Sequence, residues 1–564
     1  MSGPPLEDLP SRRPDSTVTG QVRTGGEAVV GALVALGVRH VFGVASVHNL
    51  AIVDALGREP EIRFVPVRHE QAAVHAADGS ARATGHLAVA LASTGPGTAN
   101  AMGGLYEAAY ASSPVLLLTG QVDTGYLGKG RGFLHEAEKQ ADMLRAVARR
   151  VETVRRREDV AETVLAVATD ILTGRPQPGA VEIPADLQTA KDFEPPPIVP
   201  TIRPSRPDER LIKQAAVLLE AAERPLLWAG GGAISAGASD LLTALAERLG
   251  APVLTTIEGR GTLSEDHPLA VGPNADMMLA GPLIASADVV LAVGTRFEEN
   301  SPMAQGLAIP GRLVHLDVDP GVLNRVHRAE VAIAGDGRLG LEQLVELVGA
   351  TRSERGFAAQ GREVRAAIEA ETRDAMGPDY ERLLDAMLAG VARDAIVVKD
   401  VTIAAYLWGN RLIPVYAPRT SMRPASMGIG PGLPLGIGAA VASGRTTVVL
   451  TGDGGLMLSV AELATAAQEH LPLVVCVLND CGYGILRHVQ DLAFGARHVG
   501  VDLLTPDFAA LAQAAGMASA RVTGTDGFEE AFARAVAAKE PWLIDVDIRG
   551  LVPMQLRPQR PSGR

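Results

Sequence analysis

The chain has 564 residues and a formal net charge of −13; 47% of its residues are hydrophobic and 21% are charged. Because domains average about 150 residues, this length predicts three or four of them. The hydrophobic share excludes a mainly disordered chain. The acidic balance and an aromatic share of only 4% argue against a nucleic-acid partner bound through a basic or stacking surface.

Cys476 and Cys481 are the only cysteines, too few for a disulfide framework or a four-thiolate zinc site. No run of about 18 apolar residues occurs in the sequence. The first residues also lack the apolar core of a signal peptide. We therefore expect a cytoplasmic protein that does not bind or cross a membrane.

Residues 1–23 are rich in proline, serine and arginine and predict a flexible tail. Beyond them, helix-like segments alternate with short apolar runs of buried-strand length. Such runs occur at 40–44, 63–67, 87–92 and 114–119. Strands that alternate with helices predict a parallel sheet covered on both faces. The first such unit extends over residues 24–190.

A proline-rich stretch at 191–208 predicts a semi-rigid linker and therefore a domain boundary. A second α/β unit is expected at 209–350, followed by a charged, helix-prone connector at 351–378. A third unit is expected at 379–550, with a tail at 551–564. The predicted fold class is α/β, with three doubly wound parallel-sheet domains.

The third unit contains an apolar strand that runs into the glycine-rich turn at 452–455. Small residues in such a turn let backbone N–H groups approach a phosphate. Ser459 and Glu462 have the spacing of a capping box and predict the start of a helix. Asp453 lies in the turn, where a carboxylate can hold a divalent cation against the phosphate.

A second apolar strand at 473–478 leads into the polar turn at 479–484. The carboxyl ends of neighbouring parallel strands meet at one edge of a sheet, where ligands bind. Asp453 and Asp480 are therefore predicted to converge on one Mg²⁺ ion. The glycine-rich turn alone is also compatible with a purely structural role, and the polar turn beside it favours function.

These two turns, GDGG and NDxxYG, resemble the thiamine-diphosphate signature of the acetohydroxyacid synthase and benzoylformate decarboxylase superfamily. Four further segments resemble that family, in the expected order: 68–85, 93–103, 254–268 and 430–440. The resemblance implies a pyrimidine-binding, a middle and a diphosphate-binding domain. It implies thiamine diphosphate and Mg²⁺ as cofactors. It also implies a homo-oligomer with the active site at a dimer interface, with tetramers common in the family.

The resemblance also implies roles for single residues. Asp453 and Asp480 would ligate the metal through their side chains, and Gly482 through its backbone oxygen. The residues expected to contact the cofactor are Thr402, Met427, Ile429, Gly452, Gly454, Gly455 and Tyr483. Among these, Ile429 matches the bulky residue that supports the bent cofactor.

Glu70 matches the family's activating glutamate, which hydrogen-bonds the pyrimidine ring. A carboxyl group there favours the imino tautomer of the aminopyrimidine, whose nitrogen can remove the thiazolium proton intramolecularly. Proximity of this kind can contribute roughly 7–11 kcal/mol. The structural alternative is an acidic residue that stabilises a helix N-terminus.

Two histidines are further catalytic candidates. His135 matches a glutamine of the synthases, and His48 lies in a loop that is glycine-rich in relatives. For both, a structural loop histidine is the alternative. Ser93 occupies the position of a catalytic histidine in the decarboxylases, and Val489 that of a tryptophan in the synthases.

The resemblance implies a carboligase that decarboxylates a 2-oxo acid and transfers the resulting enamine to a second carbonyl. A 2-oxo acid decarboxylase that releases an aldehyde is the alternative. We do not expect FAD, because Ser235 replaces the third glycine of a dinucleotide fingerprint in the middle unit. A flavin- or nicotinamide-dependent oxidoreductase is therefore the less favoured hypothesis.

Overall fold

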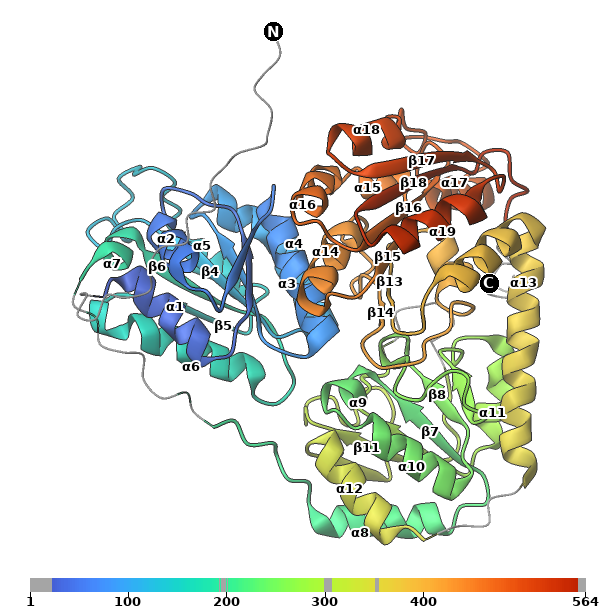
Figure 1. Ribbon diagram of the computed structural model, residues 1–564. Helices are drawn as coiled ribbons and strands as arrows, with labels where there is room; N and C mark the ends of the chain where they lie inside the picture. Colours follow the sequence, from blue (N-terminus) through green and yellow to red (C-terminus); the bar gives the residue numbers. More distant parts are fainter. Residues whose placement is uncertain are drawn as a thin grey trace.

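The computed structural model describes residues 23–191, 193, 199, 201–298, 307–349 and 355–555. The predicted N-terminal tail, apart from Arg23, lies outside the described residues, as do parts of the predicted linker, connector and C-terminal tail. Three α/β domains are present, each built on a six-stranded parallel sheet (Figure 1). The predicted fold class is therefore confirmed.

The N-terminal domain has the strand order β2-β1-β3-β4-β6-β5. Its strands are β1 (His40–Gly43), β2 (Arg63–Pro66), β3 (Ala88–Ala92), β4 (Val115–Gln121), β5 (Arg150–Thr153) and β6 (Gly179–Pro184). Its helices are α1 (Gly25–Ala35), α2 (Leu50–Arg58), α3 (Glu70–Thr84), α4 (Pro96–Ala111), α5 (Gln140–Arg145), α6 (Val160–Leu172) and α7 (Ala185–Thr189). The central strands are buried throughout, because helices cover both faces of the sheet.

The middle domain has the strand order β12-β11-β10-β7-β8-β9. Its strands are β7 (Pro225–Ala229), β8 (Val253–Thr255), β9 (Ala270–Gly272), β10 (Val289–Val293), β11 (Arg312–Asp317) and β12 (Val331–Ala334). Its helices are α8 (Glu209–Glu220), α9 (Gly231–Ser235), α10 (Ser239–Leu249), α11 (Gly281–Ser286) and α12 (Gly337–Leu347).

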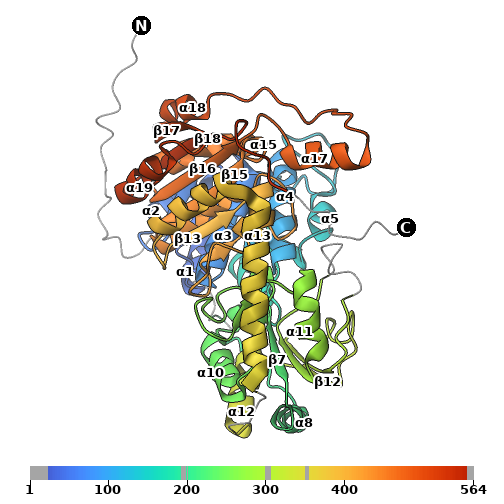
Figure 2. The same cartoon turned by 90° about the vertical axis from the view of Figure 1, so that its right-hand side faces the viewer.

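The long helical segment α13 (Arg355–Gly390) extends from the middle domain to the C-terminal domain (Figure 2). It is interrupted at Gly377, whose φ of 77° is not helical, directly before Pro378. Proline cannot continue the backbone hydrogen bonds of a helix, so the chain bends there. In the described part of the chain, neither α13 nor any other helix has the length and apolar character needed to cross a membrane.

The C-terminal domain has the strand order β14-β13-β15-β16-β18-β17. Its strands are β13 (Ile396–Lys399), β14 (Ser421–Met422), β15 (Thr447–Gly452), β16 (Leu473–Asn479), β17 (Ala518–Thr523) and β18 (Trp542–Asp547). Its helices are α14 (Gly432–Ser443), α15 (Asp453–Leu456), α16 (Leu463–Gln468), α17 (Gly484–Ala493), α18 (Phe508–Ala514) and α19 (Phe528–Ala538). Because β15 and β16 are neighbours, the two turns singled out in the sequence leave the same edge of one sheet.

The N-terminal and C-terminal domains meet where α3 packs against α14 (Figure 1). At this crossing the two backbones touch. A Cβ atom at Gly438 would collide with the carbonyl oxygen of Ala76, and one at Gly79 with the carbonyl oxygen of Leu435. Apolar side chains of both domains form one continuous core around the crossing. Glycine is required here because only a backbone without a side chain fits.

The predicted capping box is wrong. The Ser459 side chain makes no capping hydrogen bond, and its hydroxyl is buried without a partner. Glu462 instead accepts hydrogen bonds from the backbone N–H of Arg68, at 3.0 Å, and from the hydroxyl of Thr465, at 2.5 Å. The contact with Arg68 joins the N-terminal and C-terminal domains. The N–H of Glu462, which a capping box would pair with the Ser459 hydroxyl, donates to the Ser459 carbonyl at 2.9 Å.

Candidate active site

The glycine-rich turn connects the end of β15 directly to the start of α15. Asp453 is the first residue of that short helix, and its Oδ2 accepts a hydrogen bond of 2.8 Å from the backbone N–H of Gly482. Gly482 lies in the polar turn that follows β16. The structure thus brings together the two turns that the sequence placed at one sheet edge.

Two predicted cofactor contacts flank the glycine-rich turn. A Cβ at Gly454 would lie 2.6 Å from the ring of Tyr483, so the ring covers this face of the turn. A Cβ at Gly452 would lie 3.8 Å from the Cβ of Thr402. The turn therefore forms a cradle in which the backbone N–H groups of a helix start lie between two side chains, an arrangement that suits a diphosphate.

Asp453 and Asp480 face each other across this cradle. Burial and the charge of Asp480 raise the pKa of Asp453 to about 6. Burial also raises the pKa of Asp480, and the guanidinium of Arg487 opposes that rise. Two shielded acidic side chains this close to each other are stabilised by a cation between them.

The described residues contain no group of three or more His, Cys, Asp or Glu side chains spaced for a metal ion. A cation at Asp453 and Asp480 would therefore need further oxygens. The carbonyl of Gly482 can supply one, and phosphate and water commonly supply the others for Mg²⁺. The ligand set fits magnesium held together with a diphosphate.

Asp400, which the sequence analysis did not single out, ties the loop of Ile429 to the sheet. Its Oδ1 accepts from the N–H of Gly430 at 3.2 Å, and its Oδ2 from the hydroxyl of Thr451 at 3.1 Å. Ile429 is 37% exposed beside this contact, and Met427 in the same loop has a φ of 64°. An acidic residue directly after a buried strand next to β15 was the signal available in the sequence.

In the N-terminal domain, Glu70 is the first residue of α3 and is only 9% exposed. Its Oε2 accepts a hydrogen bond of 3.0 Å from the side-chain amide of Asn100. A Cβ at Gly97 would lie 2.7 Å from Oε1, so the carboxylate lies against the first turn of α4. Glu70 is thus held at the carboxyl edge of the N-terminal sheet.

His48 and His135 lie together at this same edge, with ring centroids 5.2 Å apart. His48 is buried, and its Nε2 has no hydrogen-bond partner. Burial and the neighbouring His135 lower the pKa of His48. The backbone of His135 packs against Gly95, which directly precedes α4, the helix whose first turn contacts Glu70. The three predicted catalytic residues therefore border one region.

The sequence analysis missed a buried polar network beneath the loop between β3 and α4. Gln140 Oε1 accepts from the N–H of Gly95 at 2.6 Å, and Gln140 Nε2 donates to Glu182 at 2.9 Å. Burial raises the pKa of Glu182. The hydroxyl of Ser93, in the same loop, is buried without a partner. The Gln140–Glu182 contact spans 42 positions, so no local sequence signal predicts it.

The two groups of residues form separate half-sites. Among the described residues, no hydrogen bond or ion pair joins Glu70, His48 or His135 to Asp453 or Asp480. Each half-site is bordered by exposed apolar side chains. Those near the histidines are Val47, Leu50 and Leu134, and those near the cradle are Ile429, Met457, Leu458 and Leu486.

Three family models match the chain in succession. The N-terminal TPP-binding domain of thiamine pyrophosphate enzymes matches residues 23–143, the central domain 212–344 and the C-terminal TPP-binding domain 404–546. The two TPP-binding matches include the two half-sites.

Relatives resemble the chain over most of its length. The acetolactate synthase large subunit of Corynebacterium glutamicum is 32% identical, over 89% of this chain and 82% of the relative. The acetolactate synthase isozyme 3 large subunit of Escherichia coli is 31% identical, over 95% and 97%. A protein of Pseudomonas aeruginosa named as a probable 2-ketoarginine decarboxylase is 37% identical, over 90% of each chain.

Among solved structures, a Mycobacterium smegmatis protein assigned as a thiamin diphosphate-dependent enzyme has the same fold. The TM-score is 0.80 at 24% identity, covering 93% of this chain and 99% of that one. Family models, full-length relatives and fold agree. The chain belongs to the thiamine-pyrophosphate-dependent enzymes, in the family of the acetolactate synthase large subunits.

Proposed function

We propose that the chain is a thiamine-diphosphate- and Mg²⁺-dependent carboligase of 2-oxo acids. When bound, thiamine diphosphate would supply the carbanion chemistry that decarboxylates a 2-oxo acid. The observation that carries the proposal is the meeting of the two turns, in which Gly482 donates to Asp453. In this role Asp453, Asp480 and the carbonyl of Gly482 hold Mg²⁺, and the N–H groups of Gly454 and Gly455 hold the diphosphate.

Glu70 is proposed to exchange a proton with the pyrimidine ring. Its burial and its bond to Asn100 support this role, because both hold the carboxylate in one orientation. General acid–base catalysis needs the carboxyl within hydrogen-bond reach of the nitrogen it protonates. Thr402, Met427, Ile429 and Tyr483 are proposed to contact the remainder of the cofactor.

A homodimer is proposed as the working unit. The half-sites of one chain share no described hydrogen bond, and each has exposed apolar side chains at its border. Exposed apolar patches of this kind are typical of association surfaces. The N-terminal half-site of one copy is proposed to face the C-terminal half-site of the other.

A second candidate is a 2-oxo acid decarboxylase that releases an aldehyde. The pair of His48 and His135 favours it, because an imidazole there could donate the proton that an aldehyde product requires. The 2-ketoarginine decarboxylase relative also favours it. The carboligase proposal is supported by the acetolactate synthase relatives.

A proton NMR time course with pyruvate and then larger 2-oxo acids, including 2-ketoarginine, tests the proposal. Cofactor-dependent formation of a hydroxyketone would establish carboligation. Release of aldehyde alone would establish the second candidate. Failure to turn over any 2-oxo acid, with thiamine diphosphate and Mg²⁺ bound, would overturn both. Titration with Mg²⁺ after chelation tests the metal requirement, and sedimentation tests the dimer.

A further inference from the structure

Arg487 lies in the first turn of α17, at the edge of the C-terminal domain (Figure 2). Its Nη1 donates to Oδ2 of Asp480 at 3.1 Å, and its Nε to Oδ1 of Asp502 at 2.9 Å. The side chains of Arg487 and Asp480 are 25% and 23% exposed, whereas that of Asp502 is 67% exposed. The contact with Asp480 is therefore the more shielded of the two.

The backbone already pairs these segments. The N–H of Tyr483 donates to the carbonyl of Val501 at 2.8 Å, and that of Leu503 to the carbonyl of Cys481 at 2.9 Å. Arg487 adds a side-chain bridge on top of this pairing. The polar turn that carries Asp480 is thus held between α17 and the segment 501–503.

The charges at this turn are unbalanced without Arg487. Asp453 and Asp480 are both acidic, and a diphosphate in the cradle would bring further negative charge. A divalent cation offsets the two carboxylates but leaves the diphosphate uncompensated. Because Asp480 uses one oxygen for Arg487, its other oxygen can still face a cation.

We propose that Arg487 is a positioning residue and counter-charge, which orients the Asp480 carboxylate and offsets its charge so that the turn can hold magnesium diphosphate. This inference rests on the proposed cofactor function. It does not make Arg487 a catalytic residue. Its consequence is that the effect of removing Arg487 depends on the charge at position 480.

A double-mutant cycle tests this dependence. Isothermal titration measures the affinity for thiamine diphosphate with Mg²⁺ in the wild type, Arg487→Met, Asp480→Asn and the double variant. Loss of Arg487 leaves a shielded carboxylate without its partner, so Arg487→Met should weaken binding about tenfold. Asp480→Asn should stay within about threefold of the wild type. The double variant should bind like Asp480→Asn, because the charge to be offset is gone.

Arg487→Met could reduce the affinity for thiamine diphosphate equally whether position 480 is Asp or Asn. That result would overturn the inference, because the effect of Arg487 would then not depend on Asp480. Arg487→Lys retains the charge and should recover most of the affinity. If Arg487→Met does not fold, the double variant and Arg487→Lys still decide the question. A double variant that binds much more weakly than Asp480→Asn overturns the inference.

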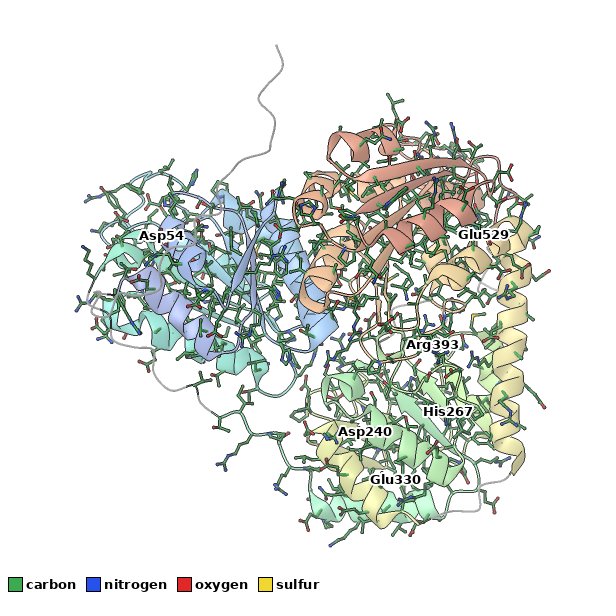
Figure 3. All side chains as sticks on the ribbon, viewed as in Figure 1. Asp54, Asp240, His267, Glu330, Arg393 and Glu529 are labelled. Carbon is green, nitrogen blue, oxygen red and sulfur yellow. The ribbon has the colours of Figure 1, made fainter. Side chains whose placement is uncertain are left out.

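Arg338→Met is the matched control. Arg338 pairs with Asp240 at 3.0 Å, and Asp240 lies in the middle domain, away from α17 (Figure 3). This variant should bind the cofactor as the wild type does. If the wild type itself binds no thiamine diphosphate, the proposed function fails. If the wild type and Arg487→Met bind equally well, only the role of Arg487 fails.

Discussion

The imidazole rings of His48 and His135 lie 5.2 Å apart at their centroids, although the two residues come from different loops of the N-terminal domain. His48 is buried and its Nε2 lacks a partner, so the pair has an unused polar atom at the edge where Glu70 also lies. A buried polar atom without a partner is costly unless a ligand satisfies it. The pair is therefore a candidate contact for a substrate oxygen.

His48→Gln and His135→Gln should each lower the rate of product formation by about 10–100-fold, since each removes a group able to transfer a proton. The double variant should lose less than the product of the two single losses, because adjacent residues act as one unit. Single-turnover NMR assays measure these rates. Strictly multiplicative losses would show that the two rings act independently.

Glu70→Gln should reduce kcat by about 10²–10⁴-fold, because the amide cannot exchange the proton proposed for the pyrimidine ring. The affinity for thiamine diphosphate should change little, since Asn100 can still contact an amide oxygen at this position. Steady-state assays and calorimetry separate the two effects. Full activity in the Glu70→Gln variant would remove Glu70 from the proposed mechanism.

Gly438→Ala should destabilise the protein by about 1–3 kcal/mol, because the added methyl group overpacks the crossing of α3 and α14. The new Cβ would collide with the carbonyl of Ala76. Gly57→Ala is the control, since a Cβ there meets nothing within 4 Å and the residue lies inside α2. Urea unfolding followed by circular dichroism compares the two. Equal midpoints would contradict the close packing at Gly438.

Acid should destabilise the protein partly through His75, whose pKa burial lowers to about 4 from an ordinary value of 6.5. Below pH 6.5 the unfolded state therefore binds a proton that the folded state does not. Stability falls as the pH drops from about 6.5 to 4, by up to roughly 3 kcal/mol. His75→Gln should flatten this decline.

Asp78, on the same helix, has the opposite slope, because burial raises its pKa to about 7 from 3.8. The folded state then binds the extra proton, and the contribution of Asp78 weakens as the pH rises between those values. The difference between His75→Gln and the wild type, measured as free energy of unfolding against pH, isolates the histidine. A pH-independent difference would contradict its burial as a neutral group.

Apolar runs in the sequence predicted strands such as β3 and β16, which are buried throughout. The strand β5 is short, with an arginine and a glutamate in its four residues, and carries no such signal. It forms because β6 offers its edge to pair with. The local sequence pattern predicts a strand when the strand forms because its side chains are buried. It fails when the strand forms because a neighbouring strand pairs with it.

The same distinction applies to the site. Asp453 and Asp480 follow apolar strands, so the sheet geometry predicted their convergence. The position of Asp400 after a buried strand was visible in the sequence, but its hydrogen bonds and the contact of Arg487 with Asp480 depend on the folded backbone. The failed cap at Ser459 is the converse case. The spacing of a capping box is present in the sequence, but the Glu462 carboxylate pairs with the backbone of Arg68, 394 residues away.

The backbone contact between α3 and α14 has a mechanical consequence. One helix begins at Glu70, and the other follows the loop of Ile429, so the crossing joins residues of both half-sites within one chain. With no side chains between them at Gly79 and Gly438, nothing can absorb a displacement. In the proposed dimer these two half-sites serve different active centres. Each chain would then connect the two active centres rigidly, so that a displacement of backbone at one centre is transmitted to the other.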